Sequence, residues 1–182
     1  MRNKILWHQV VLFSIFLGLT LLRFLKGQVS FDLNLIWWWL GGVLGFLFVF
    51  CDRLVYALVS NREEVLSVKI KELFGKGKLT AGLAMAFSER DKQKHLVMRS
   101  ALFVVIWAVL AIFTATSVGT GFPRGFVLGL GTHLIFDLWW DFRAGGRDIE
   151  LWFWQVKNVT KAEIDWFFRG AILVYLLIFW FL

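Results

Sequence analysis

Three ionisable residues recur every four positions at the end of an otherwise apolar stretch, residues 125–141. They are His133, Asp137 and Asp141. A spacing of four residues places side chains on one face of an α-helix, about one turn apart. An imidazole and a carboxylate in this arrangement can supply two ligands to a divalent ion, because both groups bind zinc and manganese. The pattern predicts a metal site or a proton-transfer site, with Asp141 as the candidate catalytic carboxylate.

A third metal ligand has to come from the same helix face or from a neighbouring element. Asp141 continues the face, and His95 lies just before the apolar stretch 98–117. A divalent ion lowers the pKa of a water molecule bound to it and makes hydroxide available for hydrolysis. The candidate metal ligands are therefore His133, Asp137 and His95, with zinc or manganese as the expected ion.

The elements that position these residues are expected to be membrane-spanning helices. Hydrophobic residues make up 59% of the 182-residue chain, whereas soluble domains are usually about 45–50% apolar. A membrane helix needs about 20 mostly apolar residues. Five stretches meet or approach this length, at residues 5–25, 35–59, 98–117, 124–142 and 166–182. The sequence predicts an all-α integral membrane protein with five transmembrane helices in a single membrane domain, residues 1–182.

Positive charge is concentrated on one side of the five expected helices. The N-terminus, the loop after the second stretch and the loop after the fourth carry 17 of the 20 Lys and Arg residues. Cytoplasmic segments are enriched in these residues. We expect a multi-pass protein of the cell membrane, with its N-terminus in the cytoplasm and its C-terminus outside. Contact with anionic lipid headgroups explains the net charge of +7, so no nucleic-acid partner is expected.

The basic loop, residues 60–97, contains two short apolar segments of its own. Residues 65–74 mix apolar and lysine side chains, residues 79–87 are mostly apolar, and Gly75 and Gly77 separate the two segments. This pattern predicts an amphipathic helical hairpin that lies on anionic lipid at the cytoplasmic face. The alternative is a surface that docks a protein partner.

Glycines recur in the second and fourth stretches. Small residues on membrane helices allow two backbones to approach closely. We expect close helix contacts at Gly41, Gly42, Gly45, Gly125 and Gly129.

Further ionisable residues are expected at the same depth as His133 and Asp137. At a rise of about 1.5 Å per residue, the polar residues of all five stretches fall in the cytoplasmic half of the membrane, including His8 in the first stretch. The charged members of this set are Asp52, Arg53, Arg99, Arg143 and Arg169. Charged side chains are costly in lipid and pair with one another. They either hold an anionic headgroup beside a metal site or form an ion-pair network that fixes helix packing.

The residues around this face resemble a known family. The segments Gly129-Leu-Gly-Thr-His-Leu-Ile-Phe-Asp137, Gly145-Gly and Leu151-Trp-Phe-Trp154 are similar to a stretch of the LexA-regulated, membrane-bound predicted metal-dependent hydrolases. The resemblance covers about residues 94–154. It implies hydrolase activity and the metal ligands His95, His133 and Asp137. Arg99 stands where the family has a second histidine, so one family ligand is missing.

Three classes of function fit the sequence. The first is a metal-dependent hydrolase, intact or degenerate, that acts on a lipid or phosphate-bearing substrate at the cytoplasmic leaflet. The second is a non-catalytic membrane scaffold or complex subunit whose basic loop docks a partner. The third is a proton- or ion-coupled carrier with His133 and Asp137 as its relay. It is disfavoured because the outer half of the expected helices lacks polar residues to complete a pathway.

Overall fold

The computed structural model describes residues 2–27, 31–89, 93–117, 120–145, 147–156 and 158–181, which form helices joined by short connections and no strand. An all-α fold is therefore confirmed for this part of the chain. The longer helices are α1 (Arg2–Leu25), α2 (Leu33–Phe48), α4 (Val65–Gly75), α5 (Leu79–Ser88), α6 (Ala101–Ser117), α7 (Gly121–Ala144) and α9 (Lys161–Phe181). The shorter ones are η1 (Val49–Cys51), α3 (Asp52–Val55), η2 (Tyr56–Ser60), α8 (Arg147–Glu150) and η4 (Leu151–Phe153).

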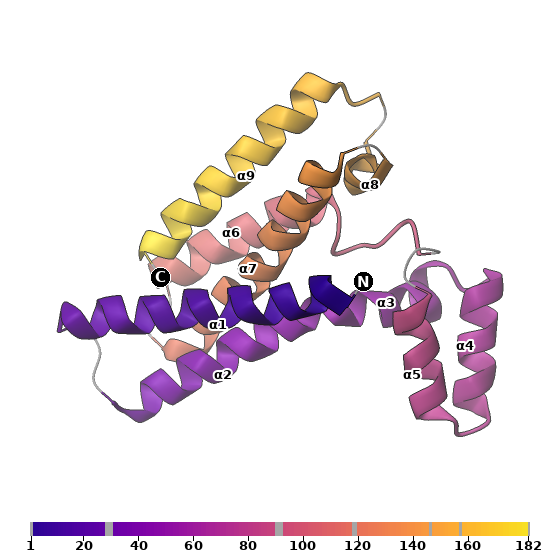
Figure 1. Ribbon diagram of the computed structural model, residues 1–182, viewed down its shortest axis with the longest axis horizontal. Helices are drawn as coiled ribbons and strands as arrows, with labels where there is room; N and C mark the ends of the chain where they lie inside the picture. Colours follow the sequence, from indigo (N-terminus) through magenta and orange to yellow (C-terminus); the bar gives the residue numbers. More distant parts are fainter. Residues whose placement is uncertain are drawn as a thin grey trace.

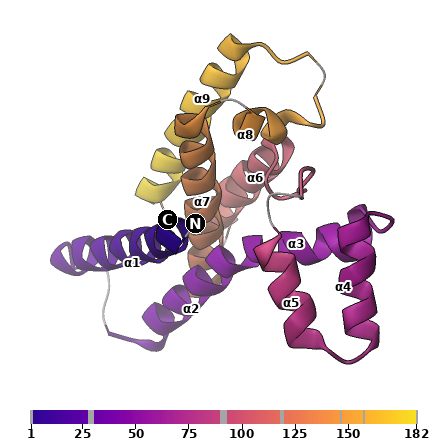
Figure 2. The same cartoon turned by 45° about the vertical axis from the view of Figure 1, so that its right-hand side comes forward.

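Helix α7, which carries the four-residue pattern, is the central helix of the molecule. It packs against α1, α2, α6 and α9 and lies between the α1–α2 pair on one side and α6 and α9 on the other (Figures 1 and 2). Residues 127–138 are all buried. His133 and Asp137 therefore face other helices, as does the buried Asp141, whereas Arg143 at the end of α7 is exposed.

Helices α2 and α7 are in direct backbone contact through their glycines. A Cβ atom added to Gly45 would lie 1.9 Å from the carbonyl oxygen of Phe126, and one added to Gly129 would lie 2.0 Å from that of Gly42. A Cβ atom on Gly125 would lie 1.9 Å from a carbonyl oxygen of α2. No side chain fits at these positions, so the expected close helix contacts are confirmed.

Residues 33–60 form one continuous helical segment that changes its winding near its end. After α2, a 3₁₀ turn (η1) and a short α-helix (α3) lead into a π-helical turn (η2). Such departures from α-helical winding often accompany functional or strained sites. Here they bring Asp52 and Arg53 to the region where α1, α6 and α7 also place polar residues.

Helices α4 and α5 form a hairpin beside the end of this segment. They run antiparallel, side by side (Figures 1 and 2), and bury a small apolar cluster of Ala57, Leu66, Ile70 and Ala86. Apolar side chains also remain exposed on the hairpin, at Val65, Val68, Leu79, Leu83 and Phe87. Its exposed surface further carries the pair Glu72–Lys76, in which the hydrogen bond from the lysine lowers the pKa of the glutamate.

Three helical segments are long and apolar enough to cross a membrane, namely Trp7–Leu25, Leu33–Ser60 and Lys161–Phe181. Helix α6 is apolar but has 17 residues, and α7 includes the ionisable residues of the site. Large apolar side chains point outward from these helices, for example Phe13, Leu17, Leu44, Val109, Phe113, Leu173 and Leu176. These findings support a membrane protein, and the crossing of the membrane by α6 and α7 stays a prediction.

The long helices alternate in direction. In Figure 1, α1, α6 and α9 begin toward the right of the view, where the 33–60 segment and α7 end.

Helix α9 begins at Lys161, before the apolar stretch expected from residue 166, because Thr160 and Glu163 cap it. The Thr160 hydroxyl accepts from the Glu163 N–H, and the glutamate carboxylate accepts from the Thr160 N–H.

Candidate metal centre

Two helices bring three potential metal ligands together. His8 lies on α1, and His133 and Asp137 lie one turn apart on α7. His8 Nε2 is 3.0 Å from Asp137 Oδ1, and His133 Nε2 is 3.5 Å from Asp137 Oδ2. All three side chains are at least nine-tenths buried. The carboxylate of Asp137 thus has one imidazole beside each oxygen.

The imidazole of His133 is fixed by a backbone carbonyl of α2. His133 Nδ1 lies 2.7 Å from the carbonyl oxygen of Phe46. A carbonyl oxygen can only accept, so Nδ1 carries the hydrogen and donates it. In the neutral ring, Nε2 then has no hydrogen and presents a lone pair toward Asp137 Oδ2. A backbone carbonyl behind the ring is the usual support of a metal-ligating histidine.

His8 is held by ring contacts. Its ring centroid lies 4.8 Å from that of His133, 4.6 Å from Phe136 and 6.1 Å from Phe46. His8 was expected to lie at the level of His133 and Asp137 but not among the metal ligands, and the structure puts it beside Asp137. Nothing in the local sequence identifies it, because only the packing of α1 against α7 joins it to Asp137.

Arg99 connects Asp137 to Asp141. Its Nε lies 3.4 Å from Asp137 Oδ2, and its Nη2 forms a short contact with Asp141 Oδ2. Asp141 also accepts a 3.0 Å hydrogen bond from the indole N–H of Trp152, and the guanidinium lies 5.9 Å from the centre of the Trp152 ring. These contacts place Asp141 beside the ligand group through Arg99.

Asp52 holds the segment that carries Arg99. Its buried carboxylate accepts hydrogen bonds from the backbone N–H groups of Val97, Met98 and Arg99, at 3.1, 2.7 and 3.3 Å. Ser100 then accepts from the N–H of Phe103 at the start of α6. Asp52 was expected to pair with an arginine side chain, and its direct hydrogen-bond partners are these backbone groups.

His95, the third candidate ligand from the sequence, lies elsewhere. Its side chain is exposed, and its ring packs 5.3 Å from the Trp154 ring between centroids. Imidazole, thiolate and carboxylate groups are the usual protein ligands of zinc. Among the described residues, His8, His133 and Asp137 are the only group of this kind whose ligand atoms all lie within 4.8 Å of one another.

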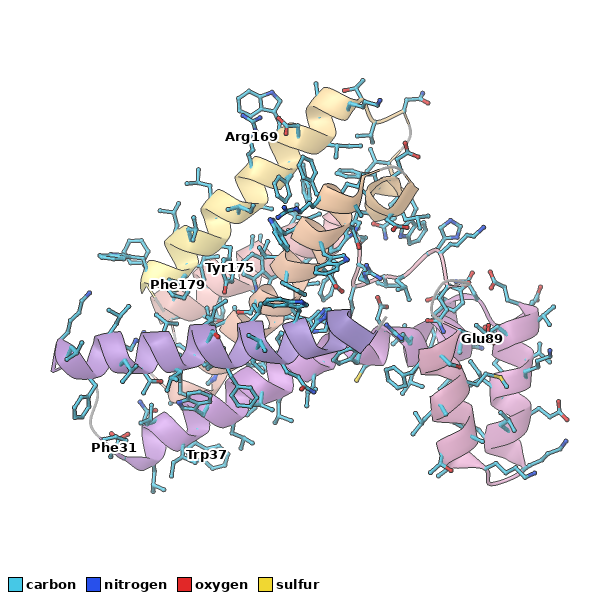
Figure 3. All side chains as sticks on the ribbon, in the orientation of Figure 1. Phe31, Trp37, Glu89, Arg169, Tyr175 and Phe179 are labelled. Atoms are coloured by element: carbon cyan, nitrogen blue, oxygen red, sulfur yellow. The ribbon has the colours of Figure 1, made fainter. Side chains whose placement is uncertain are left out.

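The remaining candidate arginines have separate surroundings. Arg53 donates to the carbonyl oxygen of Phe87 at 3.1 Å and lies over the ring of that residue. Arg143 lies over the ring of Trp139. Arg169 pairs with Asp165 on the outer side of α9 (Figure 3). Arg53 is therefore brought near the ligand group, and Arg169 is not.

The ligand group forms part of the wall of a cavity of about 500 Å³. His8, His133, Asp137 and Arg99 line it together with residues of the 33–60 segment and the hairpin. Asp141 lines a second, smaller cavity of about 250 Å³ on the other side of Arg99. Of these two cavities, the first is lined by all three potential ligands and the second by none of them.

The three residues fit a divalent ion of the zinc or manganese type. Two imidazole nitrogens and one carboxylate oxygen are a common set of protein ligands for catalytic zinc, which leaves a position for water or substrate. Ligands of a tetrahedral ion with bonds of 2.0–2.1 Å lie about 3.4 Å apart. His8 Nε2 and His133 Nε2 lie 3.0 and 3.5 Å from the two different oxygens of Asp137, and one potential ligand atom from each of the three residues lies within 4.8 Å of the others.

No protein-family model, no curated protein and no solved structure matches the chain. The resemblance to the LexA-regulated predicted hydrolases stays a prediction. The case for a metal centre therefore rests on the geometry of His8, His133 and Asp137.

Proposed function

We propose that the protein is a multi-pass protein of the cell membrane. Its spanning segments are α1, the 33–60 segment, α6, α7 and α9. Support comes from the alternating helix directions (Figure 1), the outward apolar side chains and the separation of positive charge along the sequence. In this orientation the N-terminus and the hairpin are cytoplasmic and the C-terminus is outside. The cavity with its ligand group then opens within the cytoplasmic half.

The same protein is, in this proposal, a metal-dependent hydrolase with zinc or manganese held by His8, His133 and Asp137. The observation that carries it is the orientation of His133. With Nδ1 donating to the Phe46 carbonyl, the lone pair of Nε2 faces an oxygen of Asp137 at 3.5 Å. When the ring is neutral, this lone pair and the carboxylate oxygen can both bind one divalent cation; a proton on Nε2 is the alternative partner of the carboxylate. A divalent ion there supplies Lewis-acid polarisation of a substrate and activates water.

Other residues of the chain keep the ligands in place. The Phe46 carbonyl fixes the hydrogen on Nδ1 of His133, and Arg99 Nε lies 3.4 Å from Asp137 Oδ2, the same oxygen that His133 faces. Asp52 orders the backbone that carries Arg99. Asp141, the catalytic candidate from the sequence, contacts Arg99 and Trp152. We assign it a positioning role that acts through Arg99.

Elemental analysis of the purified protein tests the proposal. We expect close to one divalent ion per chain in the wild type. His8→Gln and His133→Gln should each lose most of the metal, since two ligands remain. His95→Gln is the matched control and should keep it, because His95 is exposed and packs on Trp154. A folded wild-type protein without metal, after incubation with zinc or manganese, would rule out this function.

A second candidate is a membrane scaffold whose polar centre only fixes helix packing. It is favoured by Arg99, which already lies between Asp137 and Asp141 and offsets part of their charge. In this case His8→Gln and His133→Gln change no metal content, and Arg99→Gln lowers the unfolding temperature. Binding of a partner protein would then be expected to require the basic loop, residues 60–97.

A further inference from the structure

Helix α5 of the hairpin carries no charge and leaves an apolar stripe uncovered. Its ten residues, Leu79–Ser88, include no acidic or basic side chain. Gly82 and Ala86 are buried on the side that packs against α4. Leu79, Leu83 and Phe87 follow one another at a spacing of four and are 60%, 38% and 39% exposed. They therefore form one stripe along the helix, and we call it the α5 stripe.

The other helix of the hairpin has a different exposed side. On α4, the exposed Val68 is followed by the exposed Lys69, and the exposed Glu72 pairs with Lys76. All charged residues of the range 61–88 precede Leu79. Polar and charged side chains suit a helix side that faces water, whereas a continuous apolar stripe indicates contact with another surface. Only α5 presents such a stripe.

Phe87 shows which way the α5 stripe faces. Its ring lies 6.1 Å from the ring of Phe50 between centroids, and its carbonyl oxygen accepts a 3.1 Å hydrogen bond from Arg53. The end of α5 is thus held against the 33–60 segment, and the stripe continues away from this contact. In both views α4 and α5 run across the direction of α1, and α5 lies on the side of α4 nearer the other helices (Figures 1 and 2).

The length of the 33–60 segment gives the depth of this contact. From Leu33 to Phe50 the helix rises by about 26 Å, and the hydrocarbon core of a bilayer is about 30 Å thick. If Leu33 lies at the outer boundary of the core, Phe50 and the neighbouring Phe87 lie close to the inner boundary. Residues from Arg53 to Ser60 then cross the headgroup region, and α4 begins beyond them. Helix α5 is therefore closer to the hydrocarbon than α4.

We propose that α5 is a membrane helix that does not span: it lies in the plane of the cytoplasmic leaflet, with the α5 stripe in the boundary between headgroups and acyl chains. Helices with one apolar side bind membranes in this position. The inference rests on the proposed membrane orientation and not on the metal site. The sequence predicts contact of the whole hairpin with anionic lipid. The uncharged stripe limits the contact to α5 and makes it independent of headgroup charge.

Spin labels on the full-length protein in lipid vesicles test the position of α5. In a Cys51→Ala background, nitroxides are attached at Leu83→Cys, at Ala81→Cys and at Leu44→Cys, all of which replace exposed residues. Ala81 is the matched control, because two helical residues place it about 160° from Leu83 around the axis of α5. Leu44 is the reference on the 33–60 segment. Collisions with oxygen, which concentrates in hydrocarbon, are compared with collisions with a water-soluble nickel chelate.

We expect the ratio of oxygen to nickel collisions at Leu83→Cys to be severalfold higher than at Ala81→Cys. The ratio should be the same in phosphatidylcholine vesicles and in vesicles that also contain phosphatidylglycerol. Three results at Leu83→Cys would overturn the inference: preferred collision with nickel, which indicates water; few collisions with either reagent, which indicates cover by a second copy or another protein; and a high ratio that requires phosphatidylglycerol. Equal ratios at Leu83→Cys and Ala81→Cys would also contradict it.

The label at Leu44→Cys separates failure of the inference from failure of the membrane orientation. A high oxygen ratio at Leu44→Cys, together with any of the contradicting results on α5, would overturn only the placement of α5. Preferred collision with nickel at Leu44→Cys would overturn the proposed crossing of the membrane by the 33–60 segment, and the placement of α5 with it.

Discussion

At the scale of single residues, the site depends on one histidine that local sequence reveals and one that it does not. The spacing of His133 and Asp137 predicts their common face because helical periodicity is a local property. His8 is 129 positions away from Asp137 along the chain, so only tertiary packing brings them together. The sequence also does not predict that the carbonyl oxygen of Phe46 fixes the tautomer of His133, since every residue has such a group.

Asp52 gives a prediction at this scale. Asp52→Asn replaces one acceptor oxygen by an amide donor opposite three backbone N–H groups. We expect the free energy of unfolding to fall by about 1–3 kcal/mol, the usual cost of leaving buried polar groups unsatisfied. Denaturant unfolding in detergent micelles measures it. Asp165→Asn is the control: its pair with Arg169 is largely exposed, so its effect should stay below about 1 kcal/mol. Equal effects of the two substitutions would contradict the role of Asp52.

At the scale of elements, the α2–α7 contact sets the position of the ligand group. Glycines on both helices allow their backbones to touch, and this contact brings the Phe46 carbonyl to His133. The glycine pattern was sufficient to predict the contact, because small residues at helical spacing have few other uses in membrane helices. The start of α9 was harder to predict from hydropathy, since it is set by the polar cap of Thr160 and Glu163.

Alanine substitutions test the close contact. Gly129→Ala places a Cβ atom about 2.0 Å from the Gly42 carbonyl oxygen, so the helices must separate. We expect a loss of at least about 1–3 kcal/mol in stability, as for overpacked cores, and a lower unfolding temperature. Gly18→Ala is the matched control on α1, where an added Cβ atom meets nothing within 4 Å. It should leave stability unchanged or raise it slightly, because alanine favours helix. A neutral Gly129→Ala would show that the helices are not in contact.

At the scale of the whole molecule, composition was sufficient to predict the helical class, and the alternating helices agree with the charge distribution. Three helical segments meet the length and hydropathy of a membrane span. The other two, α6 and α7, fall short for different reasons: α6 is short, and α7 is the buried helix that carries the polar site. A helix surrounded by other helices needs less apolar surface than one that faces lipid, so hydropathy alone describes α7 poorly.

Cysteine labelling tests the proposed orientation. In a Cys51→Ala background, Thr120→Cys lies between α6 and α7, and Ser88→Cys lies at the end of the hairpin; both positions are exposed. A membrane-impermeant maleimide added to intact cells should label Thr120→Cys and not Ser88→Cys. Permeabilised cells should show labelling of both. Labelling of both positions in intact cells, or of Ser88→Cys alone, would contradict an orientation with the hairpin in the cytoplasm.

The proposed metal centre requires one ion bound by two histidines from two different helices. Pulsed electron paramagnetic resonance of manganese-loaded protein measures this most directly, because ¹⁴N couplings report imidazole ligands. We predict couplings from two histidine nitrogens in the wild type and in His95→Gln, and from one in His8→Gln and in His133→Gln. Manganese spectra without nitrogen couplings in the wild type, or unchanged in His8→Gln, would contradict the assignment of His8, His133 and Asp137 as a metal centre.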